Sequence, residues 1–358
     1  MKKLILYNEH KLLGGKMIDF AGYMMPVQYT DGVLKEHNTV RNVVGVFDVS
    51  HMGEIFISGK KSLDFLQYIT SNDVEVLQPG QVQYTYLPNT DNGIVDDLLL
   101  YKLDKNSYLL VVNASNIEKD LAWLNKHNTF NCIIDNQSEK YSLLAIQGPK
   151  SVELLQELTD VNLSKIRYYN FQIDTISGVE DVIISRTGYT GELGFELYVK
   201  NQNVKVLWNS LFDTSIEIKP IGLAARDTLR LEKGFCLYGN DIDDFTSPIE
   251  AGLGWVTKYK SKFINPLLLD YKKHSILQKK LVGLQLIGKG ISRTGYQVYN
   301  SDGKEIGTVT SGSLSPTLSL AIAMAYITIE YTKVETQVFV KIRNKLVEAK
   351  IVSLPFVD

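Results

Sequence analysis

The order of helix-like and strand-like segments is the feature that most limits how this chain can fold. Apolar residues recur at helical spacing in four segments, at residues 58–70, 116–127, 148–160 and 221–234. Runs rich in β-branched and aromatic residues, which are typical of strands, stand between these segments in groups. Helices and strands therefore do not alternate strictly, which argues against a Rossmann or TIM-barrel plan and favours the α+β class.

The strand candidates fall into two regions of the chain. Before residue 201 they occupy 53–59, 82–88, 93–103, 107–114, 141–148, 181–188 and 194–200. After about residue 276 strand patterns dominate, and turn signals at 300–305 and 342–346 indicate antiparallel pairing. The C-terminal end is therefore expected to be a β-rich domain.

Single residues predict where two of the helices begin and end. Asn116 precedes the apolar periodicity of 116–127 and is a typical N-cap, because its side chain can accept a backbone hydrogen bond. Gly234 closes the segment 221–234, as expected of a residue that adopts the left-handed conformation at low cost.

Composition and charge argue against several classes of protein. Hydrophobic residues make up 44% of the 358 residues and charged residues 22%, an ordinary globular mixture. The net charge of −2, from 38 basic and 40 acidic residues, lacks the basic surplus of a nucleic-acid-binding protein. Cys132 and Cys236 form no C-x-x-C pair, so neither a disulfide scaffold nor a zinc ribbon is expected.

The apolar stretches are too short for a secreted or membrane-spanning protein. At the N-terminus, the apolar segment of MKKLILYNEH is too short for the core of a signal peptide. The segment 318–329 is shorter than the roughly 20 residues that cross a bilayer. We therefore expect a soluble protein of the reducing cytoplasm.

Common catalytic signatures are missing from the sequence. The stretch GEIFISGKKS is one residue too long for a phosphate loop, and GKGISRTG places its third glycine too late for a dinucleotide fingerprint. The histidines include no metal-binding pair at i, i+4 spacing, and no G-x-S-x-G elbow occurs. These absences argue weakly against nucleotide, zinc and serine-hydrolase chemistry.

Two adjacent carboxylates, Asp96 and Asp97, interrupt the apolar run of 93–103. The segments 81–88, 94–103 and 107–114 read as a three-stranded meander, and side chains alternate between the faces of a strand. The two carboxylates must then point to opposite faces, and one that faces a core is costly unless it is paired. They are either a capping pair at the entry of the strand or a functional site.

Two further segments carry charged residues in contexts that suggest a ligand. In the strand at 194–200, Glu196 shares its face with Gly194, which leaves room for a flat ligand, although an ordinary solvent face is the alternative. In the helix at 221–234, Arg226, Arg230 and Lys233 form one stripe. This stripe is either solvated or a clamp for a carboxylated ligand.

Sequence blocks along nearly the whole chain resemble one family. In chain order they read HKLLGGKMIDFAGYMMPVQY, VFDVSHMGEI, NGIVDDLLLY, VVNASNIEKDLAW, AIQGPKS, RTGYTGELGFEL, GLAARDTLRLEKGFCLYGNDID, GTVTSGSLSPTL and PFV. Together, in this order and spacing, they resemble the T-protein of the glycine cleavage system, a tetrahydrofolate-dependent aminomethyltransferase. The chief motifs show no departure from the family pattern.

The resemblance implies a three-domain cloverleaf of α+β and β modules around a central folate-binding cavity. The first domain would be split into 1–50 and 141–275, with the second inserted at 51–140 and a β-barrel-like domain at 276–358. Carried over position by position, the resemblance makes Asp96 the catalytic residue and Glu196 and Arg226 the folate contacts. It also suggests a set of pocket-lining residues: Met52, Tyr84, Tyr101, Asn113 and Tyr189.

The implied reaction transfers the methylene carbon of an aminomethyl group from the lipoyl arm of H-protein to tetrahydrofolate. Ammonia, 5,10-methylenetetrahydrofolate and dihydrolipoyl H-protein would result, with folate as cosubstrate and no metal. Two alternatives remain: a folate-dependent demethylation module, and a non-enzymatic folate-binding paralogue that assists iron–sulfur assembly. Such a paralogue carries a compact Lys-Gly-Cys-Tyr segment, whereas Phe235 separates Gly234 from Cys236 here, which favours the enzyme.

Overall fold

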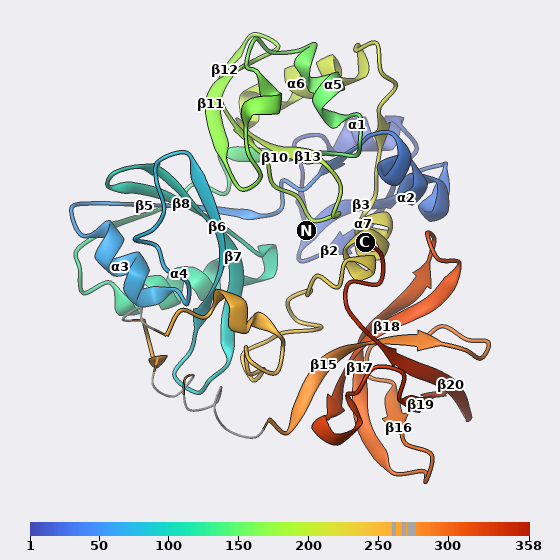
Figure 1. The fold of residues 1–358 in the computed structure, drawn as a ribbon. Helices are drawn as coiled ribbons and strands as arrows, with labels where there is room; N and C mark the ends of the chain where they lie inside the picture. The colour runs from blue at the N-terminus through green and yellow to red at the C-terminus, as the bar shows by residue number, and fades with distance from the viewer. Residues whose placement is uncertain (260–262, 267–269, 271–276) are drawn as a thin grey trace. The chain divides into compact units, whose positions relative to one another are not determined.

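The computed structural model describes residues 1–259, 263–266, 270 and 277–358 (Figure 1). The chain divides into two compact units. Unit 1 comprises Met1–Ile69, Asp73–Thr85 and Asp97–Arg226, and unit 2 comprises Thr70–Asn72, Tyr86–Asp96 and Asp227–Asp358. The expected boundary between residues 275 and 276 lies outside the described residues. The three-domain division stays a prediction.

A six-stranded sheet forms the main core of unit 1. Its strand order is β11-β12-β13-β10-β4-β14. The strands are β4 (Gly45–Asp48), β10 (Tyr141–Gln147), β11 (Phe171–Ile176), β12 (Val179–Ser185), β13 (Gly194–Lys200) and β14 (Lys219–Pro220). Strand alternation divides β13 as predicted: Phe195, Leu197 and Val199 lie in the hydrophobic core, and Glu196 and Tyr198 occupy the other face.

Two helices cover the apolar face of this sheet. α5 (Ser151–Gln156) contributes Leu154 and Leu155 to the core, and α6 (Val204–Phe212) contributes Leu207, Trp208 and Leu211 (Figure 1). The opposite face, which carries Glu196, is thereby left for polar contacts.

A five-stranded sheet carries the two adjacent aspartates. Its order is β6-β7-β8-β5-β9. The strands are β5 (Gly53–Ser58), β6 (Gln81–Pro88), β7 (Ile94–Asp104), β8 (Ser107–Val112) and β9 (Ile133–Asn136). The neighbouring positions of β6, β7 and β8 confirm the predicted meander. Asp97, Leu99 and Tyr101 share one face of β7, and Asp96 points to the other.

The N-terminal residues form a third, smaller sheet of unit 1, which the sequence patterns did not predict. β1 (Lys2–Lys3), β3 (Tyr23–Gln28) and β2 (Lys16–Phe20) are adjacent in that order. The helices α1 (Tyr7–Leu12) and α2 (Gly32–Asn42) belong to the same part of the chain.

The predicted β-rich end of the chain is a closed barrel with the order β15-β18-β17-β16-β19-β20 (Figure 1). Its strands are β15 (Lys279–Leu286), β16 (Gln297–Tyr299), β17 (Glu305–Ser315), β18 (Leu320–Thr328), β19 (Gln337–Ile342) and β20 (Lys345–Val352). β18 is the apolar stretch judged too short to cross a membrane. It pairs with both β15 and β17, so its continuous apolar character reflects burial rather than an amphipathic pattern.

The helix predictions are confirmed for all four segments, as α3 (Ser62–Ile69), α4 (Ile117–His127), α5 and α7 (Leu223–Glu232). Asn116 precedes α4, but its side chain makes no capping hydrogen bond to the helix. Gly234 follows α7 with φ of +67°, the left-handed conformation expected of a helix-ending glycine.

The last residues of the chain bind the end of α7 within unit 2. The backbone N–H groups of Phe356 and Val357 both donate to the carbonyl oxygen of Glu232, at 2.8 and 3.1 Å. A Cβ at Gly234 would lie 3.2 Å from the side chain of Leu354. This close contact and the left-handed backbone both make the position unfavourable for a residue with a side chain. The C-terminal segment is therefore part of the packing of α7.

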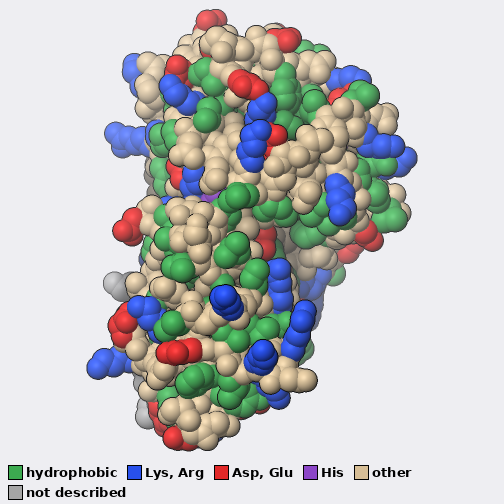
Figure 2. Space-filling view, turned by 90° about the vertical axis from the view of Figure 1, so that its right-hand side faces the viewer, with side chains coloured by type: hydrophobic (Ala, Val, Ile, Leu, Met, Phe, Trp, Pro, Cys, Tyr) green, Lys and Arg blue, Asp and Glu red, His purple; other side chains and the backbone are tan. Residues whose placement is uncertain are grey.

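Figure 2 shows basic side chains interspersed with acidic and hydrophobic ones over the visible face, as the near-balanced charge leads one to expect.

None of the helices in the described residues is long and apolar enough to cross a membrane.

Candidate functional site

The carboxylate of Asp97 is held by two of the predicted pocket residues. Tyr84 donates its hydroxyl to Oδ2 of Asp97 at 2.9 Å, and the Asn113 side-chain amide donates to Oδ1 at 3.0 Å. The same amide reaches the backbone oxygen of Asp97 at 3.0 Å. Asp97, Tyr84 and Asn113 are all half-buried, so the carboxylate combines a fixed orientation with some accessible surface.

Asp96, the residue assigned to catalysis by the resemblance, is fully buried. Tyr238 lies near it in unit 2 and donates its hydroxyl proton to the carbonyl oxygen of Ile94 at 2.8 Å, and the same hydroxyl lies 3.2 Å from Oδ2 of Asp244. Burial raises the pKa of Tyr238, and the charges of Asp244 and Asp96 add to the effect. Tyr238 is therefore a neutral donor beside the first aspartate, a neighbour that the sequence patterns did not single out.

Glu196 is a buried carboxyl group with a polar environment of its own. Its Oε2 accepts a hydrogen bond from the Thr187 hydroxyl at 2.5 Å. Burial raises the pKa of Glu196, whereas the Thr187 hydrogen bond and the Arg226 charge lower it. The ionised form of Glu196 thus depends on these two partners.

Arg226 has a guanidinium group that the described residues do not saturate. Its Cζ lies 4.6 Å from the centre of the Tyr189 ring, a cation–π contact. Burial lowers the pKa of Arg226, and Glu196 opposes this shift most strongly. The buried Nη1 has no hydrogen-bond partner among the described residues. Glu196, Arg226 and Tyr189, three of the predicted site residues, are thus brought together in unit 1.

His51 adds a second unsaturated group near Arg226. Its imidazole is 4% exposed and lies edge-on to the rings of Phe20 and Tyr23. Burial and then the Arg226 charge lower the pKa of His51 to about 4, so the ring is neutral at physiological pH. Its Nδ1 has no hydrogen-bond partner in the described part of the chain.

The solvated-stripe interpretation of Arg226, Arg230 and Lys233 is wrong for Arg230, which is 1% exposed. Arg230 donates to Asp241 at 2.6 Å, to Ser311 at 2.8 Å and to the carbonyl oxygen of Phe235 at 3.0 Å. It also donates to Asp227 at 2.8 Å. Asp227 lies one turn earlier on α7, whereas Phe235, Asp241 and Ser311 come from later in the chain, where helix periodicity gives no information about them.

The remaining predicted residues occupy different surroundings. Tyr101 is fully buried, and its hydroxyl contacts Ser185, Thr187 and Tyr198. It therefore reaches Glu196 through Thr187. Met52 is half-buried, immediately before β5. Ser185 and Thr187 follow a strand pattern without a motif that would have identified them as functional.

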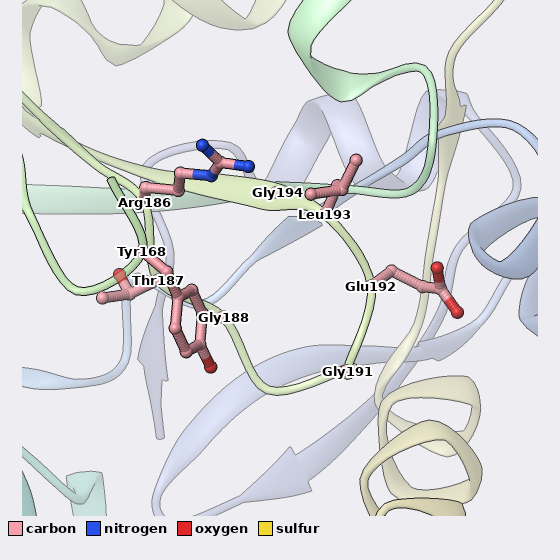
Figure 3. A pocket seen from close by; sticks show the side chains of 8 residues that line it. All are labelled: Tyr168, Arg186, Thr187, Gly188, Gly191, Glu192, Leu193 and Gly194. Atoms are coloured by element: carbon pink, nitrogen blue, oxygen red, sulfur yellow. The ribbon is translucent and has the colours of Figure 1, made fainter. Parts of the chain in front are cut away.

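A cavity of about 340 Å³ opens beside the loop between β12 and β13 (Figure 3). In Figure 3, Tyr168 and Thr187 lie at one end of this loop and Glu192 at the other. The residues that line the cavity, all of them described, are Tyr168, Arg186, Thr187, Gly188, Gly191, Glu192, Leu193 and Gly194. Thr187 connects the cavity to Glu196. In the described residues no cluster of three or more metal-ligating side chains occurs.

Comparison with family models identifies the chain. A model of the GCVT N-terminal domain matches residues 6–261, and one of the glycine cleavage T-protein C-terminal barrel domain matches residues 279–358. The chain belongs to the glycine cleavage T-protein family. Membership of this family confirms the resemblance on which the site residues were chosen.

Relatives and a solved structure agree with this family along the whole chain. Aminomethyltransferases of Flavobacterium psychrophilum and Bacteroides fragilis are each 51% identical to it, over 358 and 360 residues and 99% of both chains. The crystal structure of glycine cleavage system aminomethyltransferase T from Bartonella henselae superimposes with a TM-score of 0.94. That structure is 36% identical and covers 99% of this chain, and this chain covers 98% of it.

These matches confirm the expected α+β class with its C-terminal barrel, and they show an enzyme of the glycine cleavage system with aminomethyltransferase activity. The non-enzymatic alternative is not favoured by any of them. The family also implies folate as cosubstrate.

Proposed function

We propose that this T-protein transfers the methylene carbon of an aminomethyl group, carried on lipoylated H-protein, to tetrahydrofolate. The observation that carries the proposal is a buried carboxyl group, Glu196, that lies close enough to the unsaturated guanidinium of Arg226 for their charges to interact. Neither group is explained by packing alone, because a buried charge without saturated hydrogen bonds is costly. Both match what a planar, polar folate offers.

The bonds broken and formed balance without a redox partner. A tetrahydrofolate nitrogen bonds to the carbon, the carbon–nitrogen bond breaks and ammonia leaves. The second folate nitrogen then bonds to the same carbon while the carbon–sulfur bond breaks. The two hydrogens lost from the folate nitrogens appear on ammonia and on the released thiol. The carbon and nitrogen carry positive, iminium-like charge during the transfer.

Glu196 and Arg226 would bind folate in complementary ways. An ionised Glu196 accepts hydrogen bonds from the N–H groups of the pterin ring, which is a planar, two-point match. Arg226 presents Nη1 to a polar acceptor of the same ligand, with its guanidinium plane supported by the Tyr189 ring. Each charge-assisted bond of this kind is worth about 1.5–3 kcal/mol.

One aspartate of β7 would stabilise the positive charge of the transferring group and relay a proton. The resemblance assigns this role to Asp96. A specific observation favours Asp97 as the second candidate, because its carboxylate has accessible surface and two oriented donors, whereas Asp96 is fully buried. Tyr84 and Asn113 then position the catalytic carboxylate.

The partners proposed from the family are lipoylated H-protein and tetrahydrofolate, in the cytoplasm and without a metal ion. Nucleic acid and membrane are not proposed as partners. The near-balanced charge agrees with a small-molecule and protein partner rather than a polyanion.

The test is a comparison of Asp96→Asn with Asp97→Asn in the glycine cleavage reaction, with H-protein and tetrahydrofolate supplied. The variant of the catalytic residue should lose about 10²–10³-fold in turnover, as expected when one stabilising group is removed. Its affinity for tetrahydrofolate should stay near that of the wild type. Glu196→Gln should instead weaken tetrahydrofolate binding. A wild-type protein without aminomethyl transfer to tetrahydrofolate would refute the function, and equal losses at Asp96 and Asp97 would refute the assignment to one face.

A further inference from the structure

Four hydroxyl groups form a continuous hydrogen-bonded series that ends at Glu196. Tyr198 and Tyr101 are 2.8 Å apart, Tyr101 and Ser185 3.0 Å, and Ser185 and Thr187 2.9 Å. The last contact runs from Thr187 to Oε2 of Glu196 at 2.5 Å. Tyr101, Ser185 and Tyr198 are fully buried and Thr187 is 3% exposed, so the series is shielded from solvent.

The direction of each hydrogen bond follows from the single proton on each hydroxyl. Thr187 donates its proton to Glu196, so Ser185 must donate to Thr187. The Ser185 proton is then used, so Tyr101 must donate to Ser185, and Tyr198 must donate to Tyr101. The Tyr101–Thr187 distance of 3.3 Å is the longest of the set and is a minor branch. All four O–H dipoles therefore point toward one carboxylate.

We infer that Tyr198, Tyr101, Ser185 and Thr187 form a one-way hydroxyl chain that holds Glu196 as an oriented carboxylate for its ligand. The inference rests on the proposed function, because it concerns the group that would accept the pterin N–H bonds. These four are positioning residues, since none of them is assigned a contact with the reacting atoms.

The hydroxyl chain is suited to holding Glu196 as a carboxylate because burial disfavours the charged form of this side chain. Burial raises the pKa of this carboxyl group, and the Thr187 hydrogen bond is the strongest influence that lowers it. Hydrogen bonds in series polarise one another, so each added hydroxyl strengthens the bond to Glu196 by a modest fraction. A carboxyl group that was protonated would need an acceptor, and its pterin contacts would be lost.

Other groups also face Glu196, and they do not substitute for the chain. The titratable ones are Arg226 and the phenols Tyr101, Tyr168, Tyr169 and Tyr198. Burial raises the pKa of all four phenols, so they are neutral near physiological pH. Arg226 is the charged group among them, and it also has a ligand to bind. The chain therefore stabilises the carboxylate without competing for that ligand.

The hydroxyl chain also connects two sheets of unit 1. Tyr101 belongs to β7 of the five-stranded sheet, whereas Ser185 and Tyr198 belong to β12 and β13 of the six-stranded sheet. Asp97 lies four residues before Tyr101 on the same face of β7. One strand thus presents the candidate catalytic carboxylate and the hydroxyl that orients the folate-binding carboxylate.

The experiment measures tetrahydrofolate dissociation constants from about pH 5 to 8 for wild type, Thr187→Val, Thr187→Ser, Tyr101→Phe and Tyr198→Phe. We call the pH range in which tetrahydrofolate affinity falls with increasing acidity the acid limb. Thr187→Val should shift the acid limb upward by about one pH unit, because Glu196 loses one hydrogen bond to its charged form. The two phenylalanine variants should shift it less, and Thr187→Ser should restore the wild-type limb. At high pH all variants should approach wild-type affinity. Titration of the ligand itself is common to all of them and cancels.

Tyr86→Phe is the matched control. It removes a fully buried tyrosine hydroxyl that contacts Thr257 in unit 2, at 2.9 Å, and should leave the acid limb unchanged. A merely structural role of the hydroxyl chain would lower affinity equally at every pH, and that result would overturn the inference. An acid limb that shifts as far in Tyr86→Phe as in Thr187→Val would also overturn the inference.

A second readout does not depend on folate. Infrared difference titration of the ligand-free protein, with Glu196→Gln as the reference, follows the carboxyl stretch of Glu196 directly. The titration midpoint should rise by about one pH unit in Thr187→Val. If wild type binds no tetrahydrofolate but this midpoint moves, the proposed function fails and the hydroxyl chain stands; an unmoved midpoint refutes the chain alone.

Discussion

The two units differ in how some of their buried charges are bound. In unit 2, Arg230 binds Asp241 and Ser311, and Glu232 accepts hydrogen bonds from the hydroxyls of Ser315 and Thr317, at 2.5 and 2.8 Å. In unit 1, by contrast, Nη1 of Arg226, Nδ1 of His51 and both carboxyl oxygens of Glu54 have no hydrogen-bond partner among the described residues. Arg226 and Arg230 stand four residues apart on α7 and show the contrast most directly.

The difference teaches that burial alone does not separate a structural charge from a functional one. A saturated guanidinium such as that of Arg230 has no donor left for a ligand and stabilises the fold through its partners. An unsaturated one retains hydrogen-bonding capacity at a cost in stability. We therefore expect substitutions of the saturated charges in unit 2 to act on folding, and substitutions of the unsaturated charges in unit 1 to act on binding or on pH dependence.

The largest effect is expected for Arg230→Met. Removing one member of a buried ion pair leaves the Asp241 charge uncompensated and should lower the free energy of unfolding by about 3–5 kcal/mol. Urea unfolding followed by circular dichroism measures this loss. Lys341→Met, at an exposed position of β19, is the control and should change the unfolding free energy little. A loss below about 1 kcal/mol for Arg230→Met would remove the contrast between the units.

Arg226→Lys tests the other arginine of the pair. Lysine keeps the charge but loses the planar fork, so tetrahydrofolate affinity should fall about 10–100-fold, corresponding to about 1.5–3 kcal/mol. Stability should change by less than for Arg230→Met. Titrations at low and moderate salt should give the same defect, because a buried contact is poorly screened. Wild-type affinity, or a stability loss as large as that of Arg230→Met, would place Arg226 with the structural charges.

His51→Gln should flatten the loss of stability in acid. The pKa of His51 is lowered to about 4 by burial and Arg226, whereas the unfolded chain takes up this proton near pH 6.5. In the wild type, the contribution of neutral His51 to the free energy of unfolding is therefore complete above about pH 6.5. Up to about 1.4 kcal/mol of this free energy is lost per pH unit as the pH falls toward 4. Urea midpoints between pH 4 and 8 measure the slope. The half-exposed His127 provides the control, and His127→Gln should flatten it less.

Glu54→Gln should act with the opposite pH sign, and its effect is expected to be the smallest because glutamine retains a buried polar group. Burial raises the pKa of Glu54 well above its usual range. Its contribution to stability is thus complete below about pH 4.5 and is lost as the pH rises through the folded-state pKa. The variant should match wild type in acid and exceed it at pH 7–8 in urea unfolding. Glu180→Gln, at an exposed site, should show no such gain.

The sequence predicted local arrangements well, because strand alternation and helix spacing act over a few residues. The opposite faces of Asp96 and Asp97, the split of β13 around Glu196 and the left-handed Gly234 all follow from such rules. β18 was missed as a strand because a strand that is buried over most of its length has no polar alternation to detect.

The polar partners of the site could not be predicted in the same way. For Arg230 the sequence left open a solvated stripe and a ligand clamp, because its partners, Asp241 and Ser311, lie 11 and 81 residues away along the chain. The contact of the Tyr101 hydroxyl with Ser185 could not be predicted either, because the two residues are 84 positions apart along the chain. Pairing between sheets is decided by tertiary packing, and a single sequence records no signal for it. The family resemblance suggested the site residues without supplying their contacts.

The hydrogen bonds from Phe356 and Val357 to Glu232 have a consequence for how the protein is made. These residues leave the ribosome after most of unit 2, which also contains the early segments Thr70–Asn72 and Tyr86–Asp96. Unit 2 can therefore complete this contact only once residue 357 has emerged, while most of unit 1 is available to fold earlier. A chain truncated before Phe356 would leave the end of α7 without these two partners.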